Sequence, residues 1–155
     1  MTGLVLFRLG DREYATALAG VREVVRLTGL ADLPGMTPPL AGVIDVRGEA
    51  LPVMDLRTGP REARGDVLVV RRDHPADPAD PGPGGVGIGI AVDRVHAVTE
   101  LGAPGSPAAR GGTAPPMADV LPAYVLEVLR GPGGPVFLVD LIAMLAAAGP
   151  APGAG

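Results

Sequence analysis

Few side chains in this sequence have the types needed for acid–base, nucleophilic or metal chemistry. The chain contains two histidines, His74 and His96, one serine, Ser106, and neither cysteine nor lysine. A thiol nucleophile, a thiolate zinc site, a disulfide and a lysine Schiff base are therefore excluded for this chain. His96 has no serine close to it in the sequence, so a catalytic triad has no support. We expect a protein that is not an enzyme and that carries no cofactor.

Oxygen ligands for a hard cation occur in one short stretch. Asp73-His74 is followed by Asp77 and Asp80 with prolines between them, and the order differs from that of a calcium-binding loop. A solvated acidic loop on the surface explains the same composition. We expect no metal site here.

A glycine-rich stretch from Gly85 to Gly89 superficially suggests a phosphate-binding loop. Its spacing matches neither common nucleotide fingerprint, and the residues that follow predict a strand rather than a helix N-terminus. Glycines that alternate with valine and isoleucine are typical of a strand closely approached by another backbone. We therefore expect a strand and no nucleotide site.

The most informative charges are Glu23 and Arg47, because each lies within an apolar run. By strand alternation, Glu23 shares a face with Val21 and Val25, and Arg47 shares a face with Asp45. An unpaired ion beside apolar neighbours is costly unless water reaches it. Three interpretations remain open: both charges lie on a solvated edge, they pair with each other, or they form a polar spot in an apolar docking surface.

The elements that would position these residues are mostly strands. Short β-branched runs bounded by glycine, proline or aspartate predict a β-barrel or sandwich. Asp140 is a suitable N-cap for a helix ended by Gly149 and Pro150, and we expect two shorter helices, after Pro34 and near Asp55. The expected strands span residues 4–9, 13–18, 21–27, 42–47 (followed by a tight turn at 48–49), 50–54, 66–72, 86–92, 95–100, 124–129 and 135–139.

Length and composition limit the protein class. A chain of 155 residues suits one domain or two small subdomains, and a net charge of −4 argues against a nucleic-acid partner. The sequence has neither a signal-peptide pattern nor the roughly 20 apolar residues needed to cross a bilayer, which favours the cytosol and no direct membrane insertion. Residues 73–85 and 102–116 are rich in proline and glycine and predict long, poorly ordered surface loops.

One segment carries a family resemblance. Residues 42–57, with the sequence GVIDVRGEALPVMDLR, resemble the central signature of CheW-like domains. That signature reads approximately as glycine, two hydrophobic residues, asparagine, a hydrophobic residue and Arg-Gly, followed after two or three residues by proline, two hydrophobic residues and Asp-Leu-Arg. Further landmarks of the family occur in the same order, at residues 7–10, 14–15, 21–25, 33–35, 67–70, 89–95 and 137–141.

The resemblance implies an all-β fold of two SH3-like five-stranded β-barrel subdomains packed together. Short helices, including a C-terminal one, complete this fold. The CheW-like domain would span residues 1–148, followed by a disordered tail at 149–155. Subdomain 1 would cover approximately 14–70, and subdomain 2 approximately 1–13 plus 71–148.

The resemblance also implies a function. CheW-like adaptors are non-catalytic and couple the cytoplasmic tips of methyl-accepting chemoreceptors to the regulatory domain of the histidine kinase CheA, in the cytoplasm at membrane-associated receptor arrays. Carried over by motif, the receptor-binding residues would be Val21, Glu23, Gly42, Asp45, Arg47 and Gly48. Asp45 stands where the family has asparagine.

Two alternatives remain open at the level of sequence. One is an all-β small-ligand sensor or divergent enzyme, in which the loops line a pocket. The other is a CheW-like adaptor of a non-flagellar chemosensory pathway, whose sequence features would be the same.

Overall fold

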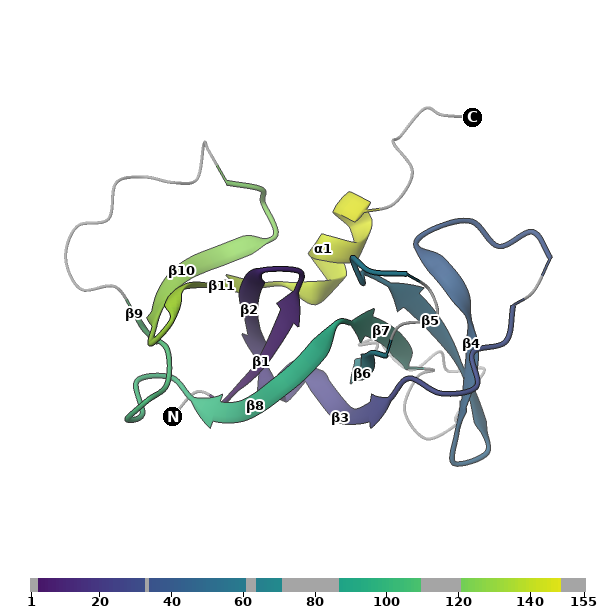
Figure 1. Cartoon of the computed structure of the whole chain (residues 1–155), viewed down its shortest axis with the longest axis horizontal. Coiled ribbons are helices and arrows are strands. Elements are labelled where there is room, and N and C mark those ends of the chain that lie inside the picture. The colour runs from purple at the N-terminus through teal and green to yellow at the C-terminus, as the bar shows by residue number, and fades with distance from the viewer. Residues whose placement is uncertain (1–2, 33, 61–63, 71–86, 110–120, 149–155) are drawn as a thin grey trace, which may run out of the picture.

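The computed structural model describes residues 3–32, 34–60, 64–70, 87–109 and 121–148, which form two curled β-sheets and a short C-terminal helix (Figure 1). The all-β prediction is confirmed. The elements are β1 (Gly3–Leu9), β2 (Arg12–Ala17), the 3₁₀ helix η1 (Leu18–Gly20), β3 (Val21–Arg26), β4 (Leu40–Val46), β5 (Glu49–Asp55), β6 (Asp66–Val70), β7 (Ile88–Val92), β8 (Arg94–Glu100), β9 (Ala108–Ala109), β10 (Val125–Gly131), β11 (Gly134–Val139) and α1 (Leu141–Ala148).

The two sheets have different strand numbers. One has five strands in the order β3-β6-β7-β5-β4, and the other has six in the order β8-β1-β2-β11-β10-β9. The sixth strand, β9, lies in the segment 102–116, which the sequence predicted to be a loop. It pairs with β10. Two strands lie in a different sheet from the one that the expected subdomain bounds imply. Most of β2 was expected in subdomain 1 but belongs with β1 in the six-stranded sheet, and β7 was expected in subdomain 2 but belongs with β6 in the five-stranded sheet. The division into two subdomains stays a prediction.

Three apolar clusters hold the sheets. One lies inside each sheet, and a third lies between the sheets, where α1 closes it from one side (Figure 1). Strand β1 serves two of them: Leu4 and Leu6 belong to the cluster inside the six-stranded sheet, whereas Val5 and Phe7 belong to the cluster between the sheets. A strand buried on both faces needs a continuous apolar run, which explains why β1 shows no polar alternation over these positions.

Two carboxylates hold the chain where it passes from one sheet to the other. Asp93, between β7 and β8, accepts hydrogen bonds from the Gly10 backbone N–H at 2.7 Å and from the Thr58 hydroxyl at 2.9 Å. Asp66, at the start of β6, accepts one from the Val95 N–H at 2.8 Å. These bonds fix the β1–β2 turn and the start of β8 relative to the five-stranded sheet.

The helix predictions have different outcomes. Helix α1 is confirmed with its N-cap: the Asp140 carboxylate accepts hydrogen bonds from the N–H groups of Ile142 and Ala143, at 3.0 and 3.1 Å. The prediction of two shorter helices is wrong for the described residues. Pro34 lies in a turn, and Asp55 is the last residue of β5. No described helix has the length and apolar character that a membrane crossing requires.

The glycine-rich strand prediction is confirmed in type, and the expected close approach of another backbone occurs at Gly87, where a Cβ would lie 3.2 Å from the Val70 carbonyl oxygen. Gly89 lies in β7, and a Cβ placed there would lie 2.8 Å from Val67 Cγ1 and 3.0 Å from Leu51 Cδ2. Neighbouring side chains, rather than another backbone, therefore exclude a larger residue at Gly89. The whole loop at 73–85 with its acidic stretch, residues 110–116 of the second expected loop, and the tail at 149–155 lie outside the described residues.

Candidate functional site

A two-residue turn joins β4 to β5 and presents Arg47 to solvent. Arg47 and Gly48 have φ angles of 52° and 84°, and Arg47 is the one non-glycine residue with positive φ in the described part of the chain. Two central residues with positive φ define the type I′ turn, whose twist suits a hairpin. The expected turn at Gly48 and Glu49 is therefore wrong by one residue. Arg47 lies in the turn, so strand alternation does not set its direction.

Asp45 fixes the shape of this turn. Its Oδ1 accepts a hydrogen bond of 2.7 Å from the Gly48 backbone N–H. Short Asx side chains commonly bond to backbone N–H groups a few residues ahead. An asparagine side chain offers the same acceptor oxygen, so the turn itself does not require the negative charge of Asp45.

Glu23 and Arg47 pair across the curled five-stranded sheet. Arg47 donates a hydrogen bond of 2.7 Å to Glu23 Oε2, and the Glu23 side chain is 15% exposed whereas that of Arg47 is 76% exposed. Glu23 comes from β3, at one edge of the sheet, and the turn belongs to the hairpin at the other edge. A backbone bridge between Ala31 and Val43 joins the same two edges. Direct pairing, one of the three interpretations of these charges, is confirmed. A docking role for the two residues stays a prediction.

Two further charges extend the pair, and sequence analysis missed both. Arg22 lies 3.9 Å from Glu23 Oε1 and 3.7 Å from Glu49 Oε2. Pairing between β3 and β6 shifts register between Val21 and Glu23, which marks a β-bulge at this point. Strict alternation put Arg22 and Glu23 on opposite faces, and a bulge changes that relationship. The result is a row of alternating charges: Glu49, Arg22, Glu23 and Arg47.

The six sequence-predicted docking residues separate into two groups. Glu23, Asp45, Arg47 and Gly48 lie together around the turn; this set is called the Arg47 surface below. The other two positions are buried. Val21 is 9% exposed and belongs to the cluster between the sheets.

Gly42 is buried because the backbone of another segment approaches it closely. A Cβ at this position would lie 2.4 Å from the Ala31 carbonyl oxygen. Ala31 and Val43 exchange backbone hydrogen bonds of 2.9 and 3.0 Å immediately beside it. Gly42 therefore permits the bridge that brings the two edges of the sheet together, and it offers no side chain to a partner.

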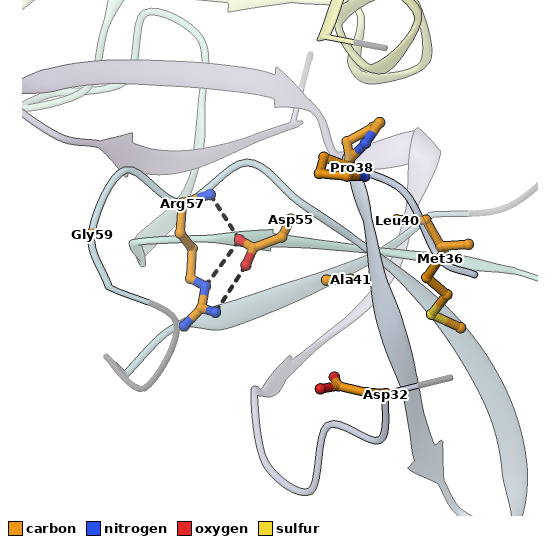
Figure 2. A pocket seen from close by; sticks show the side chains of 9 residues that line it. Asp32, Met36, Pro38, Leu40, Ala41, Asp55, Arg57 and Gly59 are labelled. Carbon is orange, nitrogen blue, oxygen red and sulfur yellow. Dashed lines mark hydrogen bonds and ion pairs between the residues drawn. The ribbon is translucent and has the colours of Figure 1, made fainter. Parts of the chain in front are cut away.

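A second ion pair, between Asp55 and Arg57, lies at the end of the β4–β5 hairpin that is opposite to the Arg47 turn. Arg57 Nε and Nη2 donate to the two carboxylate oxygens of Asp55 at 3.0 and 2.9 Å, and the Arg57 side chain is 1% exposed (Figure 2). A guanidinium buried to this extent needs a carboxylate partner. The pair borders a pocket of about 450 Å³, in which Asp32 faces it from the loop after β3 and Met36 and Pro38 contribute apolar walls (Figure 2). Asp55 and Arg57 thus hold the segment after β5.

His96 takes part in a second polar contact, on the other sheet. Its Nε2 lies 2.7 Å from Glu13 Oε1, which links β8 to β2 across β1. The described residues contain no group of three or more His, Asp or Glu side chains that could hold a metal ion. The Arg47 surface offers guanidinium donors and carboxylate acceptors, which recognise charged or hydrogen-bonding groups on a partner.

Several curated proteins match part of the chain. A "Probable chemotaxis protein CheW" from Rhizobium etli is 38% identical over 53 residues, and a "Chemotaxis protein CheW" from Bacillus subtilis is 33% identical over 54 residues. A "Chemotaxis protein CheW" from Rhizobium meliloti is 36% identical over 52 residues. These matches cover 34–35% of this chain, and the chain spans only about a third of the length of each relative.

The fold is similar to that of a solved structure, the scaffolding protein TtCheW from Thermoanaerobacter tengcongensis. The TM-score is 0.64 at 22% sequence identity, and the similarity covers 90% of this chain and 84% of that protein. At this identity the likeness concerns the fold alone. The family model of the CheW-like domain matches residues 3–149, which is almost the whole chain. This chain therefore belongs to the CheW-like domain family.

Proposed function

We propose that this protein is a non-catalytic chemotaxis adaptor that couples chemoreceptor cytoplasmic tips to the histidine kinase CheA. The observation that carries the proposal is the exposed Arg47, held by a type I′ turn, by Glu23 and by the Asp45-capped Gly48. Because the turn and the ion pair restrict the guanidinium before binding, a partner carboxylate would order little further. Membership of the CheW-like family supports an adaptor role in chemotaxis.

The receptor contact is assigned to the Arg47 surface. Glu23, Asp45, Arg47 and Gly48 would meet the receptor tip directly. Val21 and Gly42 would act indirectly, because Val21 anchors the start of β3 in the cluster between the sheets and Gly42 lets β4 approach Ala31. The kinase contact, with the regulatory domain of CheA, would use other surfaces of the two sheets. The site of action would be the cytoplasm, at membrane-associated receptor arrays.

Co-sedimentation with a candidate CheA and receptor signalling tips tests this proposal. The wild-type chain should enter the pellet with both partners. Arg47→Asp places a carboxylate beside Asp45 and Glu23 and removes the guanidinium. At a desolvated interface, such a change costs several kcal/mol, so receptor binding should be lost while kinase binding persists.

The matched control is Arg130→Asp, which makes the same charge change at an exposed position of β10 in the six-stranded sheet. Receptor binding by Arg130→Asp should equal that of the wild type. Unfolding of Arg47→Asp would assign Arg47 to the fold instead, and normal receptor binding by folded Arg47→Asp would contradict the docking assignment. Absence of co-sedimentation with any CheA and receptor would favour the small-ligand sensor or divergent enzyme. Binding only to partners from a non-flagellar pathway would place the adaptor in that pathway.

A further inference from the structure

The four aromatic residues of this chain, two phenylalanines and two tyrosines, gather in one place. Strand pairing sets Tyr14 of β2 directly beside Phe7 of β1 and Phe137 of β11, so these three rings share one face of the six-stranded sheet. Tyr14 stacks on Phe7 at a centroid distance of 5.6 Å and contacts Phe137 at 5.8 Å. Tyr124, in the turn before β10, packs against the same apolar cluster, the one between the sheets. The aromatic surface of the chain is therefore concentrated beside one face of this sheet.

Three of these rings, those of Tyr14, Tyr124 and Phe137, line a cavity of about 580 Å³ beside the β1–β2 turn. Its volume lies within the range of about 300–1,000 Å³ that is usual for sites binding small molecules. Phe7 is fully buried, whereas the three lining residues are only partly buried. A ring that is packed on its core side and open on the other leaves room for the offset or edge-to-face contact that a further ring would make. The cavity therefore suits a ligand with an aromatic body.

The charged side chains around the cavity cancel. Arg8 and Arg12 supply two guanidiniums, and these are matched by the two carboxylates of Asp11 and Glu13. Arg8 lies directly opposite Glu13 in the pairing of β1 with β2. His96, which contacts Glu13, adds a charge only when it is protonated. An ion would lose hydration on entering this cavity without a net attraction in return, which favours an uncharged ligand.

Two hydroxyl groups remain for hydrogen bonds to a ligand. Neither the Tyr14 nor the Tyr124 hydroxyl forms a hydrogen bond with another described residue. The described residues contain no buried side-chain oxygen without a partner, so water reaches both hydroxyls. A ligand amide or hydroxyl can take the place of this water, because a tyrosine hydroxyl both donates and accepts.

We infer that this cavity binds a small, uncharged aromatic molecule that carries a hydrogen-bonding group. Its ring would lie against Tyr14, Tyr124 and Phe137, and its polar group would bond to the tyrosine hydroxyls. The inference goes beyond adaptor function and does not depend on it, because the Arg47 surface belongs to the five-stranded sheet and the cavity to the six-stranded sheet. Such a scaffold would respond to a small molecule as well as to its protein partners.

Four probes, titrated separately into the full chain by isothermal calorimetry, test the class of ligand. They are 2-naphthamide, its saturated counterpart decahydro-2-naphthamide, the anion 2-naphthoate and the cation 2-naphthylmethylamine. The naphthamide should bind saturably at one site and roughly tenfold more tightly than the saturated amide, because only the aromatic body gains ring contacts. Neither ion should bind more tightly than the naphthamide. No saturable binding of the naphthamide, equal affinity of the saturated amide, or tighter binding of either ion would overturn the inference.

Variants locate the binding site. Tyr124→Leu and Phe137→Leu each replace a ring by an apolar side chain and should weaken naphthamide binding by roughly tenfold, with little effect on the saturated amide. Tyr124→Phe keeps the ring and should weaken binding only through the lost hydroxyl. Val24→Ala, which shortens an exposed side chain of β3 in the other sheet, should bind as the wild type does.

Tyr124 forms no ring pair with another aromatic residue, so Tyr124→Leu tests the site even if Phe137→Leu does not fold. The ring-proton NMR signals of the two tyrosines should shift as the naphthamide is added to the wild type. Naphthamide binding that leaves these signals unmoved, or that is unchanged in Tyr124→Leu, would place the ligand elsewhere and refute the assignment. The titrations need no partner protein, so a failure here and a failure of the adaptor proposal give different results.

Discussion

Arg47 and Glu23 form an asymmetric pair: the carboxylate is largely shielded from solvent, whereas the guanidinium that binds it is largely exposed. A guanidinium carries five N–H donors, and one of the Arg47 Nη2 donors is directed to Glu23. The remaining donors face water and are available to a partner. The single hydrogen bond between Arg47 and Glu23 therefore gives the shielded carboxylate a partner and orients the exposed guanidinium.

Replacing Arg47 by glycine should separate turn stability from binding. A side chain at φ 52° costs about 1–2 kcal/mol relative to glycine, which more than offsets a surface ion pair worth about 0.2–1 kcal/mol. We therefore expect Arg47→Gly to unfold in urea at or above the wild-type midpoint, and to lose receptor binding. The reverse change, Gly48→Ala at φ 84°, should lower the midpoint. A clear loss of stability in Arg47→Gly would contradict this expectation. It would show that the Glu23–Arg47 ion pair contributes more than the range of about 0.2–1 kcal/mol that is usual for a surface pair.

The Asp45 carboxylate should be replaceable by an amide but not by a methyl group. Asp45→Asn keeps an oxygen acceptor for the Gly48 N–H and should change the free energy of unfolding by less than about 0.5 kcal/mol. Asp45→Ala removes the acceptor and should cost about 0.5–1.5 kcal/mol. Chemical denaturation of both variants checks this. Equal stability of the two would mean that the hydrogen bond does not hold the turn in solution.

Gly42→Ala should be destabilising although it adds one carbon atom. The new Cβ would lie 2.4 Å from the Ala31 oxygen, so the Ala31–Val43 bridge must move, at a cost of roughly 1–3 kcal/mol. Gly20→Ala is the control, because nothing lies within 4 Å of a Cβ there. Thermal unfolding should show a lower midpoint for Gly42→Ala alone. Receptor binding measured well below that midpoint should be weakened through the displaced hairpin.

A double-mutant cycle measures the Glu23–Arg47 pair. Glu23→Gln, Arg47→Gln and the double variant should give a coupling free energy of about 0.2–1 kcal/mol, because one partner is exposed. The exchange of charges, Glu23→Arg with Arg47→Glu, should recover only part of the stability lost by Glu23→Arg. Arg22 lies beside Glu23 and would repel a second arginine. Full recovery would mean that Arg22 does not approach position 23 in solution.

The fold was predictable where local chemistry and tertiary packing require the same structure. The apolar run in β1, the Gly10 turn and the Asp140 cap each carry a local signal, and the structure contains all three. Strand β9 was not predictable, because Ala108 and Ala109 have no strand preference of their own and pair only through contact with β10. The helix expected near Asp55 has the same explanation, since the N–H groups of Asp55 and Leu56 donate to the carbonyls of Pro39 and Ala91, which are distant in sequence.

Prediction of the candidate site was limited by register. Alternation identified Glu23 and Arg47 as charges that need a partner, and the family resemblance selected the same residues. Alternation could not locate the bulge beside Arg22, because the bulge depends on how β3 pairs with the distant strand β6. Nor could it locate the one-residue shift of the turn, which is set by the register between β4 and β5. Burial of Val21 and Gly42 also depends on packing between elements far apart in sequence, which no local pattern encodes.

The strand order has a consequence for the timing of folding during synthesis. All five strands of one sheet lie between Val21 and Val92, so that sheet can assemble once this stretch has left the ribosome. The other sheet combines the first two strands with β8 to β11 and cannot be completed until Val139 is made. Chains emerge at about 5–20 residues per second, so β2 waits several seconds for its parallel neighbour β11, and β1 waits for its second neighbour β8. During this interval the apolar residues of β1 are without most of their sheet, so the nascent N-terminal hairpin exposes apolar surface that a chaperone would shield.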